Sequence, residues 1–264
     1  MWRRLARAIP VAIAAAVVAT GVAVGFWPPA NPLVPRAATA SAVTAPGPSE
    51  ITGSWRAPSA PKAPTSYEVA DAVGPVVHLY SAPDVPLAVR PTMTNPTWEG
   101  LAVVFLVLDT HGPWLHVRVS MRPNDFTAWV QTSEVALRTV PNHVLVELGA
   151  HRVTVTHGDT VLLQAPVAIG APSGPTPVGH FFVDGIVKVP DPNGPYGAYQ
   201  VSVSGFSDVY QTFGGGVGQI ALHGTNDPQL IGQPVSHGCV RMTNDVITKV
   251  AYLAPTGTPV DIVA

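Results

Sequence analysis

Short apolar runs, each bounded by proline or glycine turns, recur from Tyr67 to the end of this 264-residue chain and constrain its fold most. Runs of this kind, rich in β-branched and aromatic residues, are typical of strands. The pattern therefore predicts a mainly β protein. The expected strands cover residues 76–80, 101–108, 114–119, 127–131, 144–148, 152–156, 161–169, 181–183, 199–203 and 219–223.

One short helix is expected, beginning after Met242. Thr243 is of a residue type that caps helix N-termini, and the apolar side chains that follow recur at helical spacing on one face. Pro255 and Gly257 end the helix, and residues 259–263 then form a closing strand.

The N-terminus has the features of a membrane segment. Three arginines within the first seven residues precede an uncharged stretch, residues 8–35. A bilayer core of about 30 Å needs roughly 20 apolar residues, so residues 1–27 are predicted to be a membrane anchor or signal segment with its arginines on the cytoplasmic side. Residues 38–40 and 40–42 have the small-residue pattern of signal peptidase sites, so a cleaved, secreted product stays open. Both sites lie far beyond the apolar run, and this distance favours an uncleaved single-pass anchor. Either way we expect the bulk of the protein at the extracytoplasmic face of the cell membrane or in the cell wall.

Residues 28–64 contain nine prolines and few large apolar side chains, which predicts an extended, semi-rigid linker. The first 64 residues carry six basic side chains against one acidic, whereas the remaining 200 carry eight basic against fifteen acidic. The net charge of −2 argues against a nucleic-acid partner, because nucleic-acid binders carry a basic face.

Residues 67–140 are predicted to form a small β-barrel module. The stretch 112–117, the turn 122–124 and the strand 128–130, with a tryptophan in each of the two strands, resemble bacterial SH3-like modules. Two interpretations stay open for this module: a ligand-binding unit, or a spacer or lid for the next domain.

The chemistry of the chain is concentrated between residues 223 and 241. Cys239 is the sole cysteine, which excludes an intrachain disulfide, and it lies two residues after His237 and sixteen after His223. A thiol of pKa about 8.5 needs a positioned imidazole to take its proton before it attacks a carbonyl. The amides near Gly238 are natural donors to the developing oxyanion, and Arg241 shares one side of an extended chain with Cys239.

Two other interpretations of this cluster remain. Cys239 is an inert buried side chain in one, and in the other it joins His223, His237 and a fourth group as a zinc ligand. Two histidines, each beside a glycine, with an arginine nearby favour catalysis over both. We therefore expect neither a metal nor a cofactor.

At this point a family resemblance is specific. The block His223-Gly224-Thr225 and the block Ser236-His237-Gly238-Cys239-Val240-Arg241 resemble the active-site signature of the L,D-transpeptidase catalytic domain, the YkuD-type family. Residues 166–170 and 176–181 also resemble the approach segments of that domain. The resemblance covers residues 143–264 and implies a β-sandwich or barrel catalytic domain.

The resemblance implies a peptidoglycan L,D-transpeptidase. Its cysteine attacks a stem tetrapeptide at the bond before the terminal D-alanine, and the amine of a second stem then resolves the thioester into a 3→3 cross-link. Stem peptides are thus the expected partners, as acyl donor and amine acceptor, and a carbapenem is expected to acylate the enzyme. The implied roles are nucleophile for Cys239, general base for His223, orienting carbonyl for Gly224, support for His237, oxyanion amide for Gly238, and substrate binding for Arg241, Thr225, Ser236 and Gln219.

His223 is the better candidate for the base. Residues i and i+2 of an extended segment project together without pointing at each other, which disfavours His237 as the partner of Cys239. Two alternative functions remain: an L,D-carboxypeptidase or cysteine peptidase, in which water takes the acyl group, and a wall-binding module without catalysis. Residues 196–218, rich in Gly, Tyr and Phe, are a candidate lid over the substrate.

Overall fold

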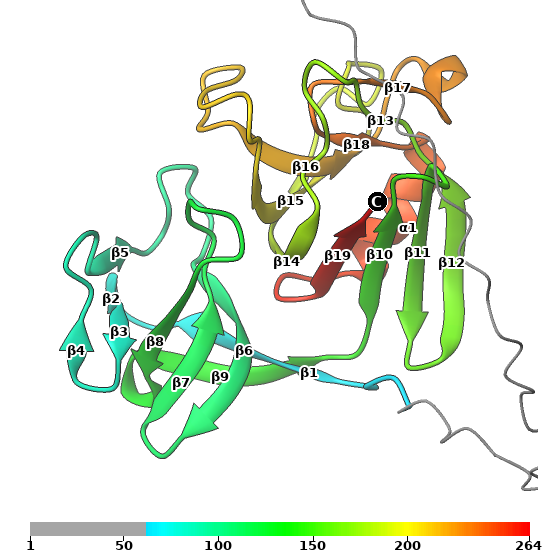
Figure 1. The fold of residues 1–264 in the computed structure, drawn as a ribbon. Helices are drawn as coiled ribbons and strands as arrows, with labels where there is room; N and C mark the ends of the chain where they lie inside the picture. The colour runs from blue at the N-terminus through cyan, green and yellow to red at the C-terminus, as the bar shows by residue number, and fades with distance from the viewer. Residues whose placement is uncertain (1–61) are drawn as a thin grey trace, which may run out of the picture. The chain divides into compact units, whose positions relative to one another are not determined.

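Two large β-sheets organise residues 62–264, the part of the chain that the computed structural model describes (Figure 1). The predicted anchor at 1–27 and nearly all of the predicted linker at 28–64 lie outside the described residues. Within the described part, no helix is long and apolar enough to cross a membrane. The mainly β fold class is confirmed.

The first sheet has seven strands in the order β4-β3-β8-β7-β6-β1-β9. These strands are β1 (Tyr67–Ala72), β3 (Tyr80–Ala82), β4 (Val85–Pro86), β6 (Val104–His111), β7 (Trp114–Arg118), β8 (Thr127–Gln131) and β9 (Val135–Val140). β2 (Val76–His78) and β5 (Thr92–Thr94) pair separately, and a 3-10 turn, η1 (Thr132–Glu134), precedes β9. The SH3-like nature of this part and the predicted boundaries stay predictions.

The second sheet has eight strands in the order β12-β11-β10-β19-β14-β15-β16-β18. They are β10 (His143–Glu147), β11 (Arg152–His157), β12 (Thr160–Pro166), β14 (Gly179–Lys188), β15 (Tyr199–Phe206), β16 (Gln219–His223), β18 (Val240–Arg241) and β19 (Pro259–Val263). β13 (Ile169–Gly170) pairs with β17 (Pro234–Ser236), and η2 (Pro228–Leu230) lies in the loop before β17.

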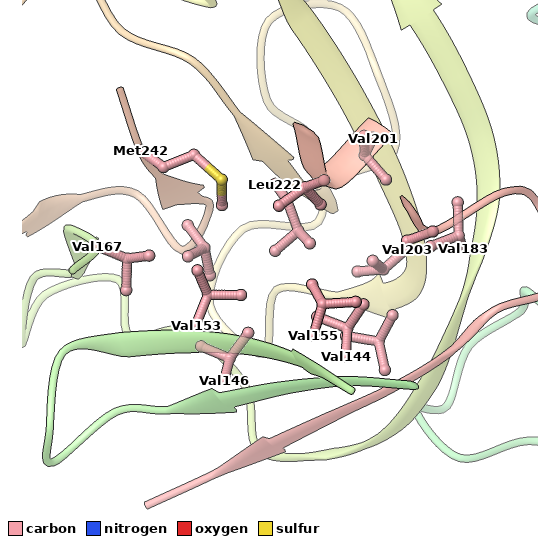
Figure 2. Close-up of a cluster of buried hydrophobic side chains, with 14 of the residues drawn as sticks. Val144, Val146, Val153, Val155, Val167, Val183, Val201, Val203, Leu222 and Met242 are labelled. Carbon is pink, nitrogen blue, oxygen red and sulfur yellow. The ribbon is translucent and has the colours of Figure 1, made fainter. Parts of the chain in front are cut away.

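The second sheet curls around one hydrophobic core. Valines of β10 and β11, near one end of the strand order, belong to the same buried cluster as Leu222 of β16 near the other end (Figure 2). Val240 of β18, the last strand, is part of this cluster as well. Alternate residues of each strand face this core, as the two-residue period of a strand requires. The other face of β16 and β18 is therefore free to line a site.

The helix α1 (Asn244–Leu253) begins where the sequence predicts it. Thr243 occupies the N-cap position with an extended backbone, but its hydroxyl donates to Asp245 Oδ1 at 2.5 Å instead of accepting from a helix amide. Ile247 and Val250 are fully buried against the core of the second sheet.

Residues 62–264 all fall within one compact unit, and the two sheets meet in it. Phe182 of β14 is fully buried in a cluster with Val69 and Leu106 of the first sheet. Arg138 of β9 donates to the Thr256 carbonyl at 2.9 Å. The first sheet is thus packed against the domain that carries the cysteine.

The segment expected to be a lid, residues 196–218, is only partly a loop. Its middle is β15, whose carbonyls and amides pair with β14 and β16, so this part does not form a loop. Two loops remain on either side of that strand, residues 189–198 and 207–218.

Candidate active site

A pocket of about 520 Å³ opens over the polar face of β15, β16 and β18. The four side chains His223, His237, Cys239 and Arg241 all line it. The tertiary structure therefore brings together residues that the chain separates by up to eighteen positions.

Strand alternation explains how these side chains come to face the pocket. β16 and β18 run parallel, with Leu222 opposite Val240 and His223 opposite Arg241. Leu222 and Val240 point into the core, so their neighbours along each strand point the other way. Cys239, immediately before β18, continues this alternation on the pocket side.

His223 is a buried imidazole with a defined tautomer. Its Nδ1 lies 2.6 Å from the Gly224 carbonyl oxygen. Because a carbonyl only accepts, Nδ1 carries the proton and Nε2 is the basic nitrogen. Burial lowers the pKa of His223 to about 4, and the positive charge of Arg241 acts in the same direction. At neutral pH the ring is therefore unprotonated.

The Gly224 carbonyl is held by a close approach of two backbone segments. A Cβ at Gly224 would lie 2.9 Å from the Cα of Gly197, and the side chain of Asn244 occupies the remaining space. Asn244 accepts from the Ala198 amide at 3.1 Å and donates to the Pro192 carbonyl at 2.9 Å. The first residue of α1 thus fixes the 189–198 loop against the strand end that carries the imidazole.

That loop also supplies an aromatic neighbour for the imidazole. The ring of Tyr196 meets the ring of His223 edge-on, at a centroid distance of 5.1 Å and an interplanar angle of 62°. Tyr196 is itself part of the pocket wall. It therefore restricts the positions that the imidazole can adopt.

Cys239 is a partly exposed free thiol. Burial of the sulfur is the main influence on its pKa and raises it, while a hydrogen bond from the Ala221 amide and the charge of Arg241 act the other way. Together with the unprotonated His223, this means that thiol and imidazole are both neutral at rest. Ionisation of the sulfur must accompany a transfer of its proton.

Ser236 organises the turn that presents Cys239. Its buried hydroxyl accepts from the Gly238 amide at 3.1 Å and donates to the Cys239 carbonyl at 2.5 Å. Gly238 has a φ of +121°, and a Cβ there would lie 2.9 Å from Ile220 Cδ1. The turn therefore requires glycine at this position.

This arrangement differs from the sequence-based expectation for Gly238. That residue was expected to offer its amide to an oxyanion, but the amide is bonded to the Ser236 hydroxyl in this structure. The signature glycine serves the conformation of the turn here.

The four expected substrate-binding residues divide into two pairs. Arg241 and Gln219 line the pocket, whereas Thr225 and Ser236 are buried and do not line it. The Thr225 hydroxyl accepts from the Asp227 amide at 3.0 Å, and that of Ser236 holds the cysteine turn. Their hydroxyls serve the backbone, so direct substrate contact by these two residues is not what the structure presents.

Arg241 has capacity for a further partner. It forms no ion pair within residues 62–264, and its buried Nε lacks a hydrogen-bond partner among the described residues. A guanidinium with free donors in a pocket is suited to a carboxylate, which it can bind through two parallel hydrogen bonds.

His237 lines the pocket and is exposed. Its ring packs against Phe213 at 4.9 Å and Tyr210 at 5.7 Å, both from the 207–218 loop. These aromatic contacts tie the loop to the residue before the cysteine turn.

Several residues of the pocket wall had no role predicted from the sequence. The segment 196–218 was singled out as rich in Gly, Tyr and Phe, and that signal covers Tyr196, Tyr210 and Phe213. Trp98 and Glu99, in the connection between β5 and β6, also line the pocket, and no sequence signal indicated them. The pocket is therefore built from both halves of the described chain.

No metal site emerges between residues 62 and 264: no three or more His, Cys, Asp or Glu side chains gather there in a way that would hold an ion. His223, His237 and Cys239 are thus not arranged as a zinc site in this structure.

Comparison with known proteins places the part of the chain that holds this pocket in a family. The model of the L,D-transpeptidase catalytic domain, YkuD, matches residues 141–262, which include the whole cluster from His223 to Arg241. A protein of Bacillus subtilis named as the L,D-transpeptidase YkuD is 37% identical over 124 residues, covering 47% of this chain and 67% of that protein.

Among solved structures, one from Bdellovibrio bacteriovorus is 26% identical at a TM-score of 0.37, covering 46% of this chain and 47% of that one. L,D-transpeptidase 3 of Mycobacterium tuberculosis is 17% identical at a TM-score of 0.39, covering 55% and 76%. This chain thus spans about half the length of the Bdellovibrio chain. On the family model and the sequence relative, the chain belongs to the L,D-transpeptidase YkuD family.

Proposed function

We propose that this protein is a peptidoglycan L,D-transpeptidase that works through an acyl-enzyme on Cys239. The observation that carries the proposal is the shared pocket face of β16 and β18. It presents a thiol, an imidazole whose tautomer leaves Nε2 basic, and an arginine with free donors. These are the groups that an acyl transfer to sulfur from a carboxylate-bearing peptide requires.

In the first step His223 Nε2 takes the thiol proton as the sulfur attacks the carbonyl carbon before the terminal D-alanine of a stem tetrapeptide. The carbon–sulfur bond forms, and a tetrahedral oxyanion results. The carbon–nitrogen bond then breaks, and the imidazolium returns the proton to the departing amine of D-alanine. A thioester and free D-alanine remain.

In the second step the side-chain amine of a neighbouring stem attacks the thioester carbonyl. His223 takes a proton from that amine and delivers it to the departing sulfur, which restores the thiol and the neutral imidazole. The new amide is a 3→3 cross-link. When water replaces the amine, the same thioester gives a carboxypeptidase product.

The oxyanion needs donors, and the Gly238 amide is bonded to Ser236. We assign the Cys239 amide as the main donor, because it follows the glycine turn and belongs to the attacking residue itself. Arg241 would hold a carboxylate of the donor stem, and Gln219 would contact the peptide from the floor of the pocket. His237 would support the wall that carries Tyr210 and Phe213.

The proposed substrate implies a location. Stem peptides lie outside the cytoplasmic membrane, so we place the enzyme at the extracytoplasmic face or in the wall. The predicted N-terminal anchor supports this location.

A carbapenem tests the proposal directly. The full chain incubated with meropenem is expected to gain one adduct with the mass of the drug, located at Cys239 by peptide mapping. Cys239→Ser provides the control and should gain none. A titratable Cys239 thiol in folded protein that forms no adduct would overturn the acyl-enzyme proposal.

Products decide between transfer and hydrolysis. Incubation with purified tetrapeptide muropeptides, followed by mass spectrometry, is expected to give cross-linked dimers with loss of one D-alanine per cross-link. Tripeptides without dimers would identify a carboxypeptidase, and unchanged muropeptides bound to the protein would identify a wall-binding module.

A further inference from the structure

The 207–218 loop forms one wall of the pocket, yet little of the second sheet holds it. Tyr210, Phe213 and Val217 of this loop line the pocket. Its two ends approach each other where the Ser207 amide donates to the Gly218 carbonyl at 2.8 Å. The position of the aromatic wall therefore depends on what anchors this neck.

Arg122 is that anchor, and it comes from the first sheet's β7–β8 connection. Its guanidinium donates to three carbonyls of the loop: Ser207 at 2.8 Å, Tyr210 at 3.1 Å and Val217 at 3.2 Å. The same group lies over the Phe206 ring, 5.0 Å from its centroid. One planar fork thus binds the loop's entry, its turn and its exit.

Asn124, two residues further on, fastens the strand that leads into the loop. It accepts from the Phe206 amide at 2.8 Å and donates to the Phe206 carbonyl at 2.8 Å. This two-way pairing imitates a neighbouring strand at the end of β15. The loop therefore starts from a fixed point.

The backbone around the guanidinium leaves no spare room. Gly218 has a φ of +70°, and a Cβ there would lie 2.1 Å from the Tyr210 carbonyl oxygen and 3.1 Å from Arg122 Nη2. The loop exit is thus fitted to the arginine and to the turn that the arginine holds. A side chain at Gly218 would displace one of them.

Loss of the guanidinium would leave these carbonyls without their donor. The loop retains internal contacts, such as the mutual hydrogen bonds between Phe213 and Gly216 at 2.9 and 3.1 Å. Those contacts preserve the shape of its tip but do not place the tip over the pocket. Besides the packing of Tyr210 and Phe213 against His237, placement relative to Cys239 depends on Arg122.

We infer that Arg122 is a positioning residue for the substrate pocket, through which the first sheet holds the aromatic wall in place for the donor peptide. That the ligand is a donor peptide rests on the proposed function. That Arg122 holds the 207–218 loop does not. His223 ends β16 and Cys239 directly precedes β18, both outside this loop, so the chemical step itself is expected to depend little on Arg122.

Arg122→Ala tests the inference in the full chain, with Arg138→Ala as the matched control. Arg138 is also an arginine of the first sheet that donates across to the second part of the chain, but there its acceptor is Thr256 and not the 207–218 loop. Its other acceptor is Asp71, within the first sheet. Arg138→Ala therefore controls for a general loosening of the contact between the sheets.

The first measurement is amide hydrogen exchange by mass spectrometry. Peptides covering residues 207–218 are expected to exchange at least tenfold faster in Arg122→Ala than in wild type, and at the wild-type rate in Arg138→Ala. Wild-type exchange in Arg122→Ala, or an equal increase in both variants, would overturn the inference.

The second measurement is meropenem acylation resolved into an apparent affinity and a maximal rate. Arg122→Ala should weaken the apparent affinity about tenfold and leave the maximal rate within about threefold of wild type. A fall in the maximal rate with unchanged affinity contradicts a positioning role. A wild-type protein without any adduct defeats the proposed function, while the exchange measurement still decides the role of Arg122.

Arg122→Lys keeps the inference testable if the alanine variant does not fold. An ammonium reaches fewer of the three carbonyls and lacks the planar fork, so exchange and affinity should lie between those of wild type and a full loss. A lysine variant equal to wild type in both measurements would show that the fork geometry plays no part, against the inference.

Discussion

His223 and Arg241 are register partners in the parallel pairing of β16 with β18, so a permanent cation stands beside the imidazole on the pocket face. Burial first, and then this charge, lower the pKa of His223 to about 4. The pairing that places the proposed substrate-binding cation therefore also contributes to keeping the imidazole of His223, the proposed base, unprotonated. Cys239 lies two residues before Arg241. The positive charge of Arg241 acts to lower the pKa of its thiol, and the unprotonated His223 can accept its proton.

The two histidines are expected to differ sharply when replaced. His223→Ala removes the proton acceptor and should lower the meropenem acylation rate by about 10²- to 10⁴-fold, the usual contribution of a general base. His237→Ala removes packing against Phe213 and Tyr210 and should cost less than about tenfold. Stopped-flow fluorescence or time-resolved mass spectrometry gives both rates, and the reverse ranking would assign the base to His237.

The pH dependence of acylation should show an acid limb near 4. Because the folded pKa of His223 is lowered to about 4, the imidazole stays basic as the pH falls through 6.5 and loses that form only around 4. Arg241→Met removes a neighbouring positive charge, which raises the pKa of His223 and should move the limb to higher pH. A wild-type limb near 6.5 in acylation rates measured on folded protein would contradict this account.

Ser236→Ala should damage both the fold and the reaction. The change leaves the Gly238 amide and the Cys239 carbonyl without their buried partner, which costs about 1–3 kcal/mol of unfolding free energy. Acylation should slow as well, because the turn that presents the thiol loses its brace. Ser81→Ala, which removes an exposed hydroxyl bonded to the Val85 carbonyl, is the control for denaturant titration. Equal, small effects from both changes would disprove the bracing role.

Asp184→Asn should alter the pH dependence of stability. Desolvation raises the pKa of Asp184 to about 6, despite hydrogen bonds from Ser120 and Gln219. The folded state therefore holds a proton that the unfolded chain releases near 4, so this group's contribution to stability is greatest below about 4 and is lost as the pH rises through 6.

In urea titrations, the free energy of unfolding of Asp184→Asn, taken relative to wild type, should therefore be higher at pH 7.5 than at pH 4.5. Glu68→Gln, a change at an exposed carboxylate of β1, should show much less of this dependence. If the free energy of unfolding of Asp184→Asn differed from that of wild type by the same amount at both pH values, the raised pKa of Asp184 would be refuted.

Local patterns were sufficient for many elements. The runs at 127–131, 219–223 and 259–263 appear as β8, β16 and β19 with the predicted bounds. β1 and β9 were not predicted. In β1, which has the sequence YEVADA, acidic residues and alanines obscure the strand preference. These two strands form through their mutual pairing, with Tyr67 opposite Val140.

The sequence by itself determined the fold class, the single helix after Met242 and the cluster of chemically active residues around Cys239, because strand period, turn residues and motif spacing are local properties. Only the tertiary structure decided the tautomer of His223, the engagement of the Gly238 amide by Ser236 and the hold of Arg122 on a loop 85 to 95 residues away. Those relationships depend on strand register and on the curl of the second sheet. Both are settled by packing between distant segments, and no local pattern records them.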